Sequence, residues 1–258
     1  MISSLLLVIG LCYLPPIVSH FLLKSETWKH PKYLWTPILL HSLALLWIGL
    51  FQELWVSPTF GLALLSNIMF LSFQIFRRNS KMETLGVVHL PLGFLLLVFS
   101  MIVPNHQLTS SVSWWVVMHI ILILVGFGFF ALGFAQSLIF LFVHRRLKSK
   151  NLRGIVFFPS LERLDRLNHI SSFIGFLSLS LGIVAGGFWS VNMQAWTWDL
   201  GSISSVALWL LYAISIHARL VFGRRMLWTA WFSVFGFGAM SLVISIASIF
   251  GVWHLEPQ

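Results

Sequence analysis

The sequence predicts an all-α, polytopic integral membrane protein with about eight transmembrane helices and both termini outside. The first observation is composition: of the 258 residues, 58% are hydrophobic and only 9% are charged, whereas a soluble domain carries about 25% charged residues. The second is a series of apolar runs near the length of about 20 residues that a spanning helix needs. The third is that the basic residues gather in alternate connections between these runs.

Eight stretches have the length and composition of a membrane-spanning helix. In chain order they are 2–23, 36–53, 59–76, 84–103, 114–143, 170–188, 203–221 and 227–252. The first lacks a basic n-region and a small-residue cleavage site, so we interpret it as a retained helix. The fifth is long and is expected to project beyond the bilayer. Every polar stretch is short, so residues 1–258 are expected to form a single membrane domain.

The longest connection, roughly 144–169, is basic and contains FPSLERLDRLNH. Leu161, Leu164 and Leu167 in this connection have helical spacing. We therefore expect a short helix here that lies on the membrane surface.

All sixteen Lys and Arg residues lie in the connections that follow the odd-numbered spans or, for Arg219, at the end of the seventh span. These residues are Lys24, Lys29 and Lys32; Arg77, Arg78 and Lys81; Arg145, Arg146, Lys148, Lys150, Arg153, Arg163 and Arg166; and Arg219, Arg224 and Arg225. Basic connections stay in the cytoplasm, which places both termini outside. The net charge of +9 is then a topology signal, helped by attraction to anionic lipid headgroups, and needs no nucleic-acid partner.

The connection between the sixth and seventh spans, residues 186–202, reads GGFWSVNMQAWTWDLGS and is here named the tryptophan loop. It holds Trp189, Trp196 and Trp198 beside one carboxylate, Asp199, and no Lys or Arg. Tryptophan is enriched at membrane interfaces, so anchoring explains many of these side chains. Anchoring explains the acid and its fixed spacing poorly, because an interfacial belt needs neither. A large, flat aromatic ligand is the alternative explanation.

Histidine gives the second indication of a ligand. Ionisable groups inside a bilayer usually face a bundle interior or a cavity. His119 lies about 7 Å below the outer boundary at 1.5 Å per residue, and His254 lies at the outer end of the last span. Two imidazoles can supply both axial bonds to a haem iron, and indoles can stack on the porphyrin. Near the inner side, His217 and His41 could form a second bis-histidine site.

The remaining histidines have simpler explanations. A single histidine within the membrane can form a hydrogen bond to a neighbouring helix, and we favour this for His20, His89 and His144. The histidines interpreted as solvated loop residues are His30, His106 and His169. The only cysteine, Cys12, lies in an apolar run, which excludes a cysteine-based metal site and covalently attached haem c.

Glycines recur at helical spacing in two spans. Gly175, Gly182 and Gly186 share one face of the sixth span, and Gly126 and Gly133 share one face of the fifth. Small residues allow close contact between helices in lipid. Close packing of these two helices is the preferred explanation, and room for a flat ligand is the alternative.

These features resemble the CcsA/CcmC-type haem-handling proteins of cytochrome c assembly, whose mark is a tryptophan-rich external WWD domain flanked by external histidines. The matching run begins at LERLDRL, passes through GFLSLSLGIVAGGFWS and AWTWD, and continues to ALWLLYAISIHARL and FGVWHLEPQ. The segment SWWVVMHIILILVGFGFFALGFAQSLIFL resembles the family's first histidine-bearing helix. The resemblance covers roughly 111–256, and the N-terminal third is more loosely similar to the smaller HemX- and YpjD-like members.

By position, the resemblance implies that His119 and His254 are the external haem ligands. It implies that His217 is a ligand within the membrane, near the cytoplasmic side. His41 is our own proposal for the inner partner, because the family does not supply one here. The side chains that match the core of the WWD loop are Trp189, Trp196, Trp198 and Asp199.

The function that the resemblance implies is movement of haem b to the tryptophan loop for delivery to apocytochrome c. The chain would be the haem-presenting part of a cytochrome c haem lyase, acting with a CcsB/ResB-like subunit in a bacterial-type cytoplasmic membrane. Haem would enter from the inner side by way of His217 and His41. Asp199 would orient a tryptophan or accept a hydrogen bond from one.

The loop also departs from the family pattern W-G-x-x-W-x-W-D-P-K-E. Asn192 and Met193 replace Trp and Gly, and Leu200, Gly201 and Ser202 replace Pro, Lys and Glu. The departures favour haem binding over full synthase chemistry. Two alternatives therefore stand beside the first function: a HemX- or YpjD-like protein that transports haem or regulates without ligation, and a non-haem transporter or scaffold subunit.

Overall fold

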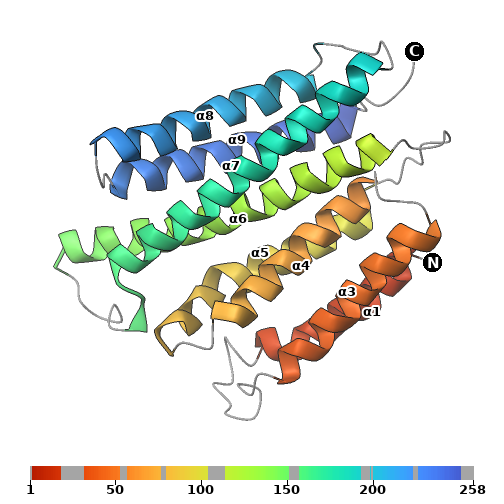
Figure 1. The fold of residues 1–258 in the computed structure, drawn as a ribbon. Helices are drawn as coiled ribbons and strands as arrows, with labels where there is room; N and C mark the ends of the chain where they lie inside the picture. Colours follow the sequence, from red (N-terminus) through yellow and green to blue (C-terminus); the bar gives the residue numbers. More distant parts are fainter. Residues whose placement is uncertain are drawn as a thin grey trace. The chain divides into compact units, whose positions relative to one another are not determined.

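The computed structural model describes residues 2–18, 32–52, 57–76, 80–103, 114–150, 157–192, 198, 200–222 and 226–250. All regular elements in this part of the chain are helices, as the fold class predicts. In chain order they are α1 (Ile2–Val18), α3 (Lys32–Gln52), α4 (Pro58–Phe76), the 3-10 helix η2 (Ser80–Leu85), α5 (Gly86–Ile102), α6 (Trp114–Lys148), α7 (Leu161–Asn192), α8 (Leu200–Phe222) and α9 (Met226–Phe250) (Figure 1).

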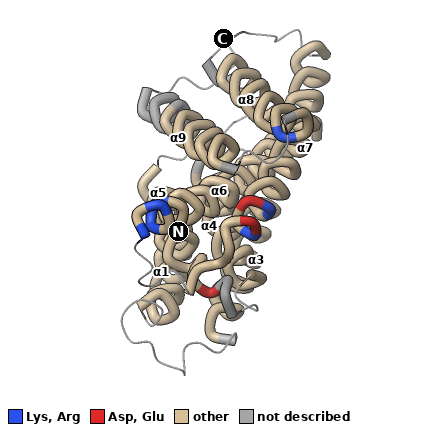
Figure 2. The backbone as a smooth tube through the Cα atoms, turned by 90° about the vertical axis from the view of Figure 1, so that its left-hand side faces the viewer, with Lys and Arg blue, Asp and Glu red and all other residues tan. Residues whose placement is uncertain are grey.

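Six of the described helical segments are long and apolar enough to cross a membrane. They are Tyr33–Leu50, Thr59–Phe76, Glu83–Ile102, Trp114–Lys148, Leu161–Asn192 and Ser202–Val221, and the shorter apolar helices Ile2–Val18 and Leu227–Leu242 accompany them. Figure 2 shows tubes that are tan along most of their length, with few stretches of Lys, Arg, Asp or Glu. The chain is therefore a multi-pass membrane protein, and the count of eight spans and the side of each terminus stay predictions.

The first of two compact units contains Met1–Gln107 and Leu152–Pro159. Within it, α1 packs on α3, α3 on α4, α4 on α5, and α5 back on α1, so the four helices form a closed ring. Tyr13 of α1 lies at the centre, fully buried, with its ring stacked on Phe70 of α4 at a centroid distance of 3.8 Å. The interior of this unit is thus mostly aromatic and aliphatic, with buried polar side chains such as His41, Asn67 and His89 among them.

The second unit contains Leu108–Asn151 and Ser160–Gln258. Its helices form a similar ring, in which α6 contacts α7 and α9, and α8 contacts α7 and α9. The closest approach joins α6 and α7: a Cβ on Gly126 would lie 3.1 Å from the carbonyl oxygen of Gly175. A Cβ on Gly182 would lie 2.8 Å from Ile123 Cγ1. The glycine faces therefore serve close helix packing, as the preferred explanation predicted.

The helical spacing of Leu161, Leu164 and Leu167 is confirmed, but the expected separate surface helix is wrong. These residues form the first turns of α7, which runs unbroken from Leu161 to Asn192. Leu164 is fully buried, because this part of α7 packs inside the second unit. His169 accordingly lies in α7 and not in a loop.

Candidate functional site

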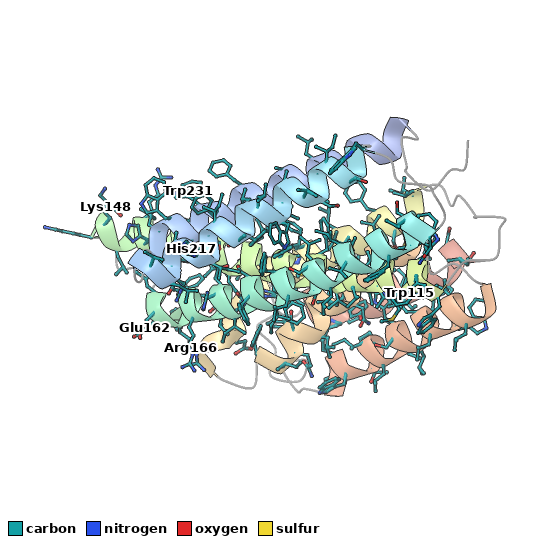
Figure 3. All side chains as sticks on the ribbon, turned by 45° about the horizontal axis from the view of Figure 1, so that its top comes forward. Trp115, Lys148, Glu162, Arg166, His217 and Trp231 are labelled. Carbon is teal, nitrogen blue, oxygen red and sulfur yellow. The ribbon has the colours of Figure 1, made fainter. Side chains whose placement is uncertain are left out.

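The second unit has two chemically different ends. The basic end contains the last turn of α6, with Arg145, Arg146 and Lys148, and the first turns of α7. The tryptophan end contains the first turn of α6 and the last turns of α7. Figure 3 shows Trp115 at one end, and Lys148, Glu162, Arg166, His217 and Trp231 at the other.

His119 is the best-defined ligand candidate at the tryptophan end. Its Nδ1 lies 2.7 Å from the carbonyl oxygen of Gly182 on α7. Because a carbonyl oxygen only accepts, Nδ1 carries the hydrogen and donates it. The neutral imidazole then has its lone pair on Nε2, the nitrogen through which a histidine held in this way binds a metal. The contact fixes both the orientation and the tautomer of the ring.

Gly186 makes this position of His119 possible. A Cβ built on Gly186 would overlap the Nδ1 and Cε1 atoms of the His119 ring. A glycine at this position lets the imidazole lie directly against the backbone of α7. The glycine face of α7 therefore has two roles: it brings α6 close, and it forms a cradle for the histidine.

Aromatic side chains surround the same end. Trp115 is 50% exposed and stacks on Phe188, which is 58% exposed, at a centroid distance of 6.0 Å. Trp189 is partly exposed in the last turn of α7, and Trp198 is 65% exposed. Exposed aromatic faces offer stacking surfaces to a flat, apolar ligand.

The predicted bounds of the tryptophan loop need correction. Its first residues, 186–192, continue α7, and Leu200 begins α8. Of its four predicted site residues, Trp189 and Trp198 are described by the structure. Trp196 and Asp199 lie outside the described residues, as does His254. The roles predicted for these three side chains stay predictions.

The two inner candidates lie in different surroundings. His41 is fully buried in the first unit, where its Nδ1 lies 3.4 Å from the hydroxyl of Tyr13. His217 is exposed on α8 of the second unit. The two belong to separate units, each described by itself, so a shared bis-histidine site stays a prediction.

Sequence analysis missed a buried ion pair at the basic end. Arg219 of α8 donates to both carboxylate oxygens of Asp165 on α7, at 2.9 and 2.7 Å. The exposed fractions of the two side chains are only 12% and 2%. The signal was present, since LERLDRL and HARL hold an acid and a base at the edges of two spans. In the sequence alone, Arg219 contributes only to the charge asymmetry.

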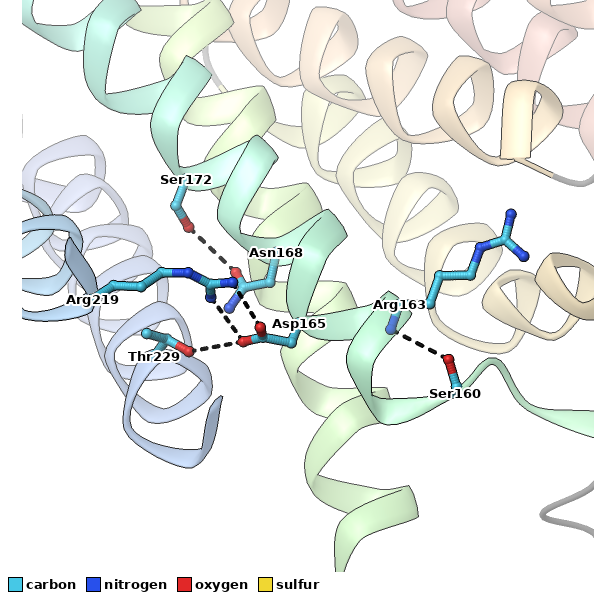
Figure 4. Close-up of polar contacts among 7 residues, drawn as sticks. All are labelled: Ser160, Arg163, Asp165, Asn168, Ser172, Arg219 and Thr229. Carbon is cyan, nitrogen blue, oxygen red and sulfur yellow. Dashed lines mark hydrogen bonds and ion pairs between the residues drawn. The ribbon is translucent and has the colours of Figure 1, made fainter. Parts of the chain in front are cut away.

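Further polar groups surround this ion pair (Figure 4). The hydroxyl of Thr229 on α9 lies 3.3 Å from Asp165 Oδ1. One turn along α7, Asn168 Oδ1 accepts hydrogen bonds from Ser172 at 3.3 Å and from Ser233 of α9 at 2.9 Å. The polar cluster therefore joins α7, α8 and α9 inside a predominantly apolar unit.

The fold and site define a class: a multi-pass helical membrane protein with a histidine and exposed aromatic rings at one end of a bundle. The chain belongs to the cytochrome c assembly protein family, because the sequence model of that family matches residues 55–252. This match runs from the first unit into the second.

The chain is also similar to individual proteins, at lower sequence identity and over part of its length. The cytochrome c biogenesis protein CcsA of Cyanidium caldarium is 25% identical over 133 residues, which cover 41% of this chain and 45% of that protein. CcsA of Prochlorococcus marinus strain MIT 9301 is 26% identical over 172 residues, 55% of this chain and 56% of that protein. Protein HemX of Bacillus subtilis is 25% identical over 181 residues, 67% of this chain and 61% of that protein. The chain spans about half the length of the curated relatives it matches.

Proposed function

We propose that this protein binds haem b at the tryptophan end of its second unit and hands it on during cytochrome c maturation. The observation that carries the proposal is the hydrogen bond from His119 Nδ1 to the Gly182 carbonyl. With Nδ1 engaged in this way, Nε2 would be the nitrogen that binds iron, and the Gly186 cradle supports this orientation of the ring. Membership of the cytochrome c assembly family supports the same function.

We assign a role in haem binding to each residue of the proposed site. His119 Nε2 would supply one axial bond to iron and His254 the other. Trp196 and Trp198 would hold the porphyrin by stacking, and Asp199 would fix their geometry. Haem brings the iron and the groups that react with the thiols of apocytochrome c. The protein's own part is to position the cargo and to set its redox poise.

The setting follows from the charge asymmetry. The protein would lie in a bacterial-type cytoplasmic membrane, with the tryptophan loop and the C-terminus on the outer side. A CcsB/ResB-like membrane subunit would bring the apocytochrome. Haem would arrive from the inner side, where the charge asymmetry would place His217, a residue exposed on α8.

A second function is favoured by one specific observation. The HemX similarity covers two thirds of this chain, more than the CcsA similarities described above. A HemX-like protein would bind haem for transport or regulation without attaching it to a cytochrome. The two functions share the haem site and differ in the last step.

The test is purification of the full chain followed by a pyridine haemochrome assay. We expect about one haem b per chain at the proposed outer site, or two if the inner site is also filled. A protein that purifies without haem and does not bind added haem would contradict both functions. Co-expression with a CcsB/ResB-like subunit and an apocytochrome then separates them, since only the first function yields covalently attached haem.

A further inference from the structure

Two aromatic side chains meet across α6 and α7 at the tryptophan end and stay exposed. Trp115 of α6 and Phe188 of α7 stack with an interplanar angle of 30°, and 50% and 58% of their surfaces are uncovered. A stacked pair that only packs helices together looks different in the same unit. Phe130 of α6 and Tyr212 of α8 lie 3.7 Å apart and are each 1% exposed. The first pair therefore joins two helices and also presents aromatic surface.

The exposed pair lies next to the His119 contact. Trp115 precedes His119 by one helical turn, which places it about 6 Å along the α6 axis and about 40° around it. On α7, Phe188 comes after Gly182, whose carbonyl accepts the hydrogen bond from His119. Going toward the tryptophan end along either helix, the contact of His119 with Gly182 is thus followed by the contact of Trp115 with Phe188. The two contacts are successive layers of one helix–helix seam.

The neighbouring tryptophan has a different position. Trp114 also lies in the first turn of α6 and is 70% exposed, more than Trp115. It is five residues from His119, so it points about 140° away from His119 around the helix axis. Exposure alone would favour Trp114 as the residue that meets lipid or ligand. Position relative to His119 instead singles out Trp115.

We propose that Trp115 and Phe188 form an aromatic platform for the porphyrin of haem bound at His119. This inference rests on the proposed function and extends it, because it adds two residues of the helices to the loop tryptophans. A porphyrin is broad, flat and apolar over most of its surface, and such rings bind aromatic side chains by stacking or edge contacts. A porphyrin whose iron lies at His119 and that extends toward the tryptophan end meets this pair one turn away.

The platform differs from the histidine in what it recognises. The two rings already hold each other in the structure, so a ligand that stacks on them loses little free energy to ordering side chains. Stacking does not involve the iron. The platform should therefore add affinity for any flat tetrapyrrole, with or without a metal, whereas His119 should add affinity only when iron is present.

Porphyrin titration of the haem-free, full-length protein in detergent tests the platform. The two probes are haemin and metal-free protoporphyrin IX, each corrected for binding to protein-free micelles. Trp115→Ala and Phe188→Ala should raise the Kd for both probes about tenfold, the size expected for loss of one stacked ring. Trp115→Phe should recover most of the affinity, and Trp114→Ala is the matched control that should bind as the wild type does. His119→Ala should weaken the binding of haemin far more than that of protoporphyrin.

Wild-type affinity for both probes in folded Trp115→Ala would overturn the platform, and so would equal weakening by Trp114→Ala. The melting temperature of the haem-free protein separates packing from binding. A lower melting temperature of Trp115→Ala with an unchanged Kd would mean that the pair only joins α6 to α7, which also overturns the proposal. Failure of the proposed function gives a different result, because the wild-type protein itself would then bind neither probe.

Discussion

The two ends of the second unit hold their helices together by different means. At the tryptophan end, α6 and α7 meet through glycine backbones, and His119 binds a main-chain carbonyl of α7. At the basic end, charged and hydroxyl side chains of three helices bind one another. The first arrangement places a histidine and exposed aromatic faces at one end of the unit, where the proposed ligand would bind. The second uses its polar side chains to fix the helices.

This comparison indicates where the protein tolerates change. A ligand site must present groups that can bind the ligand, whereas a structural cluster uses its polar groups for contacts within the protein. Substitutions at the basic end should therefore act first on stability. Substitutions at the tryptophan end should act first on haem occupancy.

The largest expected effect is the loss of the buried ion pair. Asp165→Asn leaves the Arg219 guanidinium buried without its counter-charge, and breaking such a pair costs about 3–5 kcal/mol. The unfolding temperature in detergent should fall sharply. Arg166→Gln, at an exposed position one residue along α7, is the matched control and should change little. Equal stability of the two variants would mean that the ion pair is unimportant.

Gly186→Ala tests the cradle at the other end. The new methyl group overlaps the His119 ring, and overpacking of this kind costs about 1–3 kcal/mol. The ring must move from the Gly182 carbonyl, so the low-spin haem spectrum should weaken as well. Gly238→Ala is the control, because no atom lies within 4 Å of its added Cβ; it should be stable and keep its haem. A Gly186→Ala protein with wild-type stability and spectrum would refute the cradle.

Much of this fold could be predicted from the sequence, because hydropathy and charge act locally. The run 59–76 corresponds to α4 within a residue at its start, and 203–221 lies within α8. The extension of α7 to Leu161 could not be predicted in this way. In this extension Asp165 is buried in an ion pair with Arg219, which is 54 positions away in the sequence. A hydropathy window assigns such a charge to the surface and misses its partner.

The site was predictable only in part, because residue types can be read from the sequence and tertiary contacts cannot. His119 and the tryptophans are visible as unusual residues in an apolar chain. The contact of His119 with Gly182, 63 positions away, is a tertiary contact that residue types do not reveal. The tautomer that makes His119 a ligand candidate therefore had to come from the structure.

A smaller effect is expected from the exposed tryptophans. Trp198→Ala should weaken haem binding about tenfold, since base–aromatic stacking, a rough scale for this ring, is worth about 1–3 kcal/mol. Trp228→Ala at the basic end, where the side chain is 62% exposed, should leave haem content unchanged. Trp196→Ala and Asp199→Asn should follow Trp198→Ala if the loop holds the porphyrin. Equal haem loss in the Trp228→Ala control would indicate that the loop tryptophans only anchor the protein at the membrane interface.

A reporter fusion tests which side of the membrane each end of the second unit faces, without any substitution in the protein. The charge asymmetry predicts that the basic end faces the cytoplasm and that the C-terminus lies outside. An alkaline phosphatase fused after Gln258 should be active on the outer side. Activity of a cytoplasm-only reporter at the same position would show that the C-terminus is cytoplasmic and would contradict the predicted orientation.

The most direct test of the haem site is the absorption spectrum of His119→Ala compared with that of His144→Ala. His144 lies on the same helix at the basic end, where it stacks on Phe140, so it controls for the loss of an imidazole from α6. We predict that His119→Ala shifts or abolishes the low-spin haem spectrum, that added imidazole restores it, and that His144→Ala retains it. An unchanged spectrum in folded His119→Ala would contradict ligation by His119 and the central claim with it.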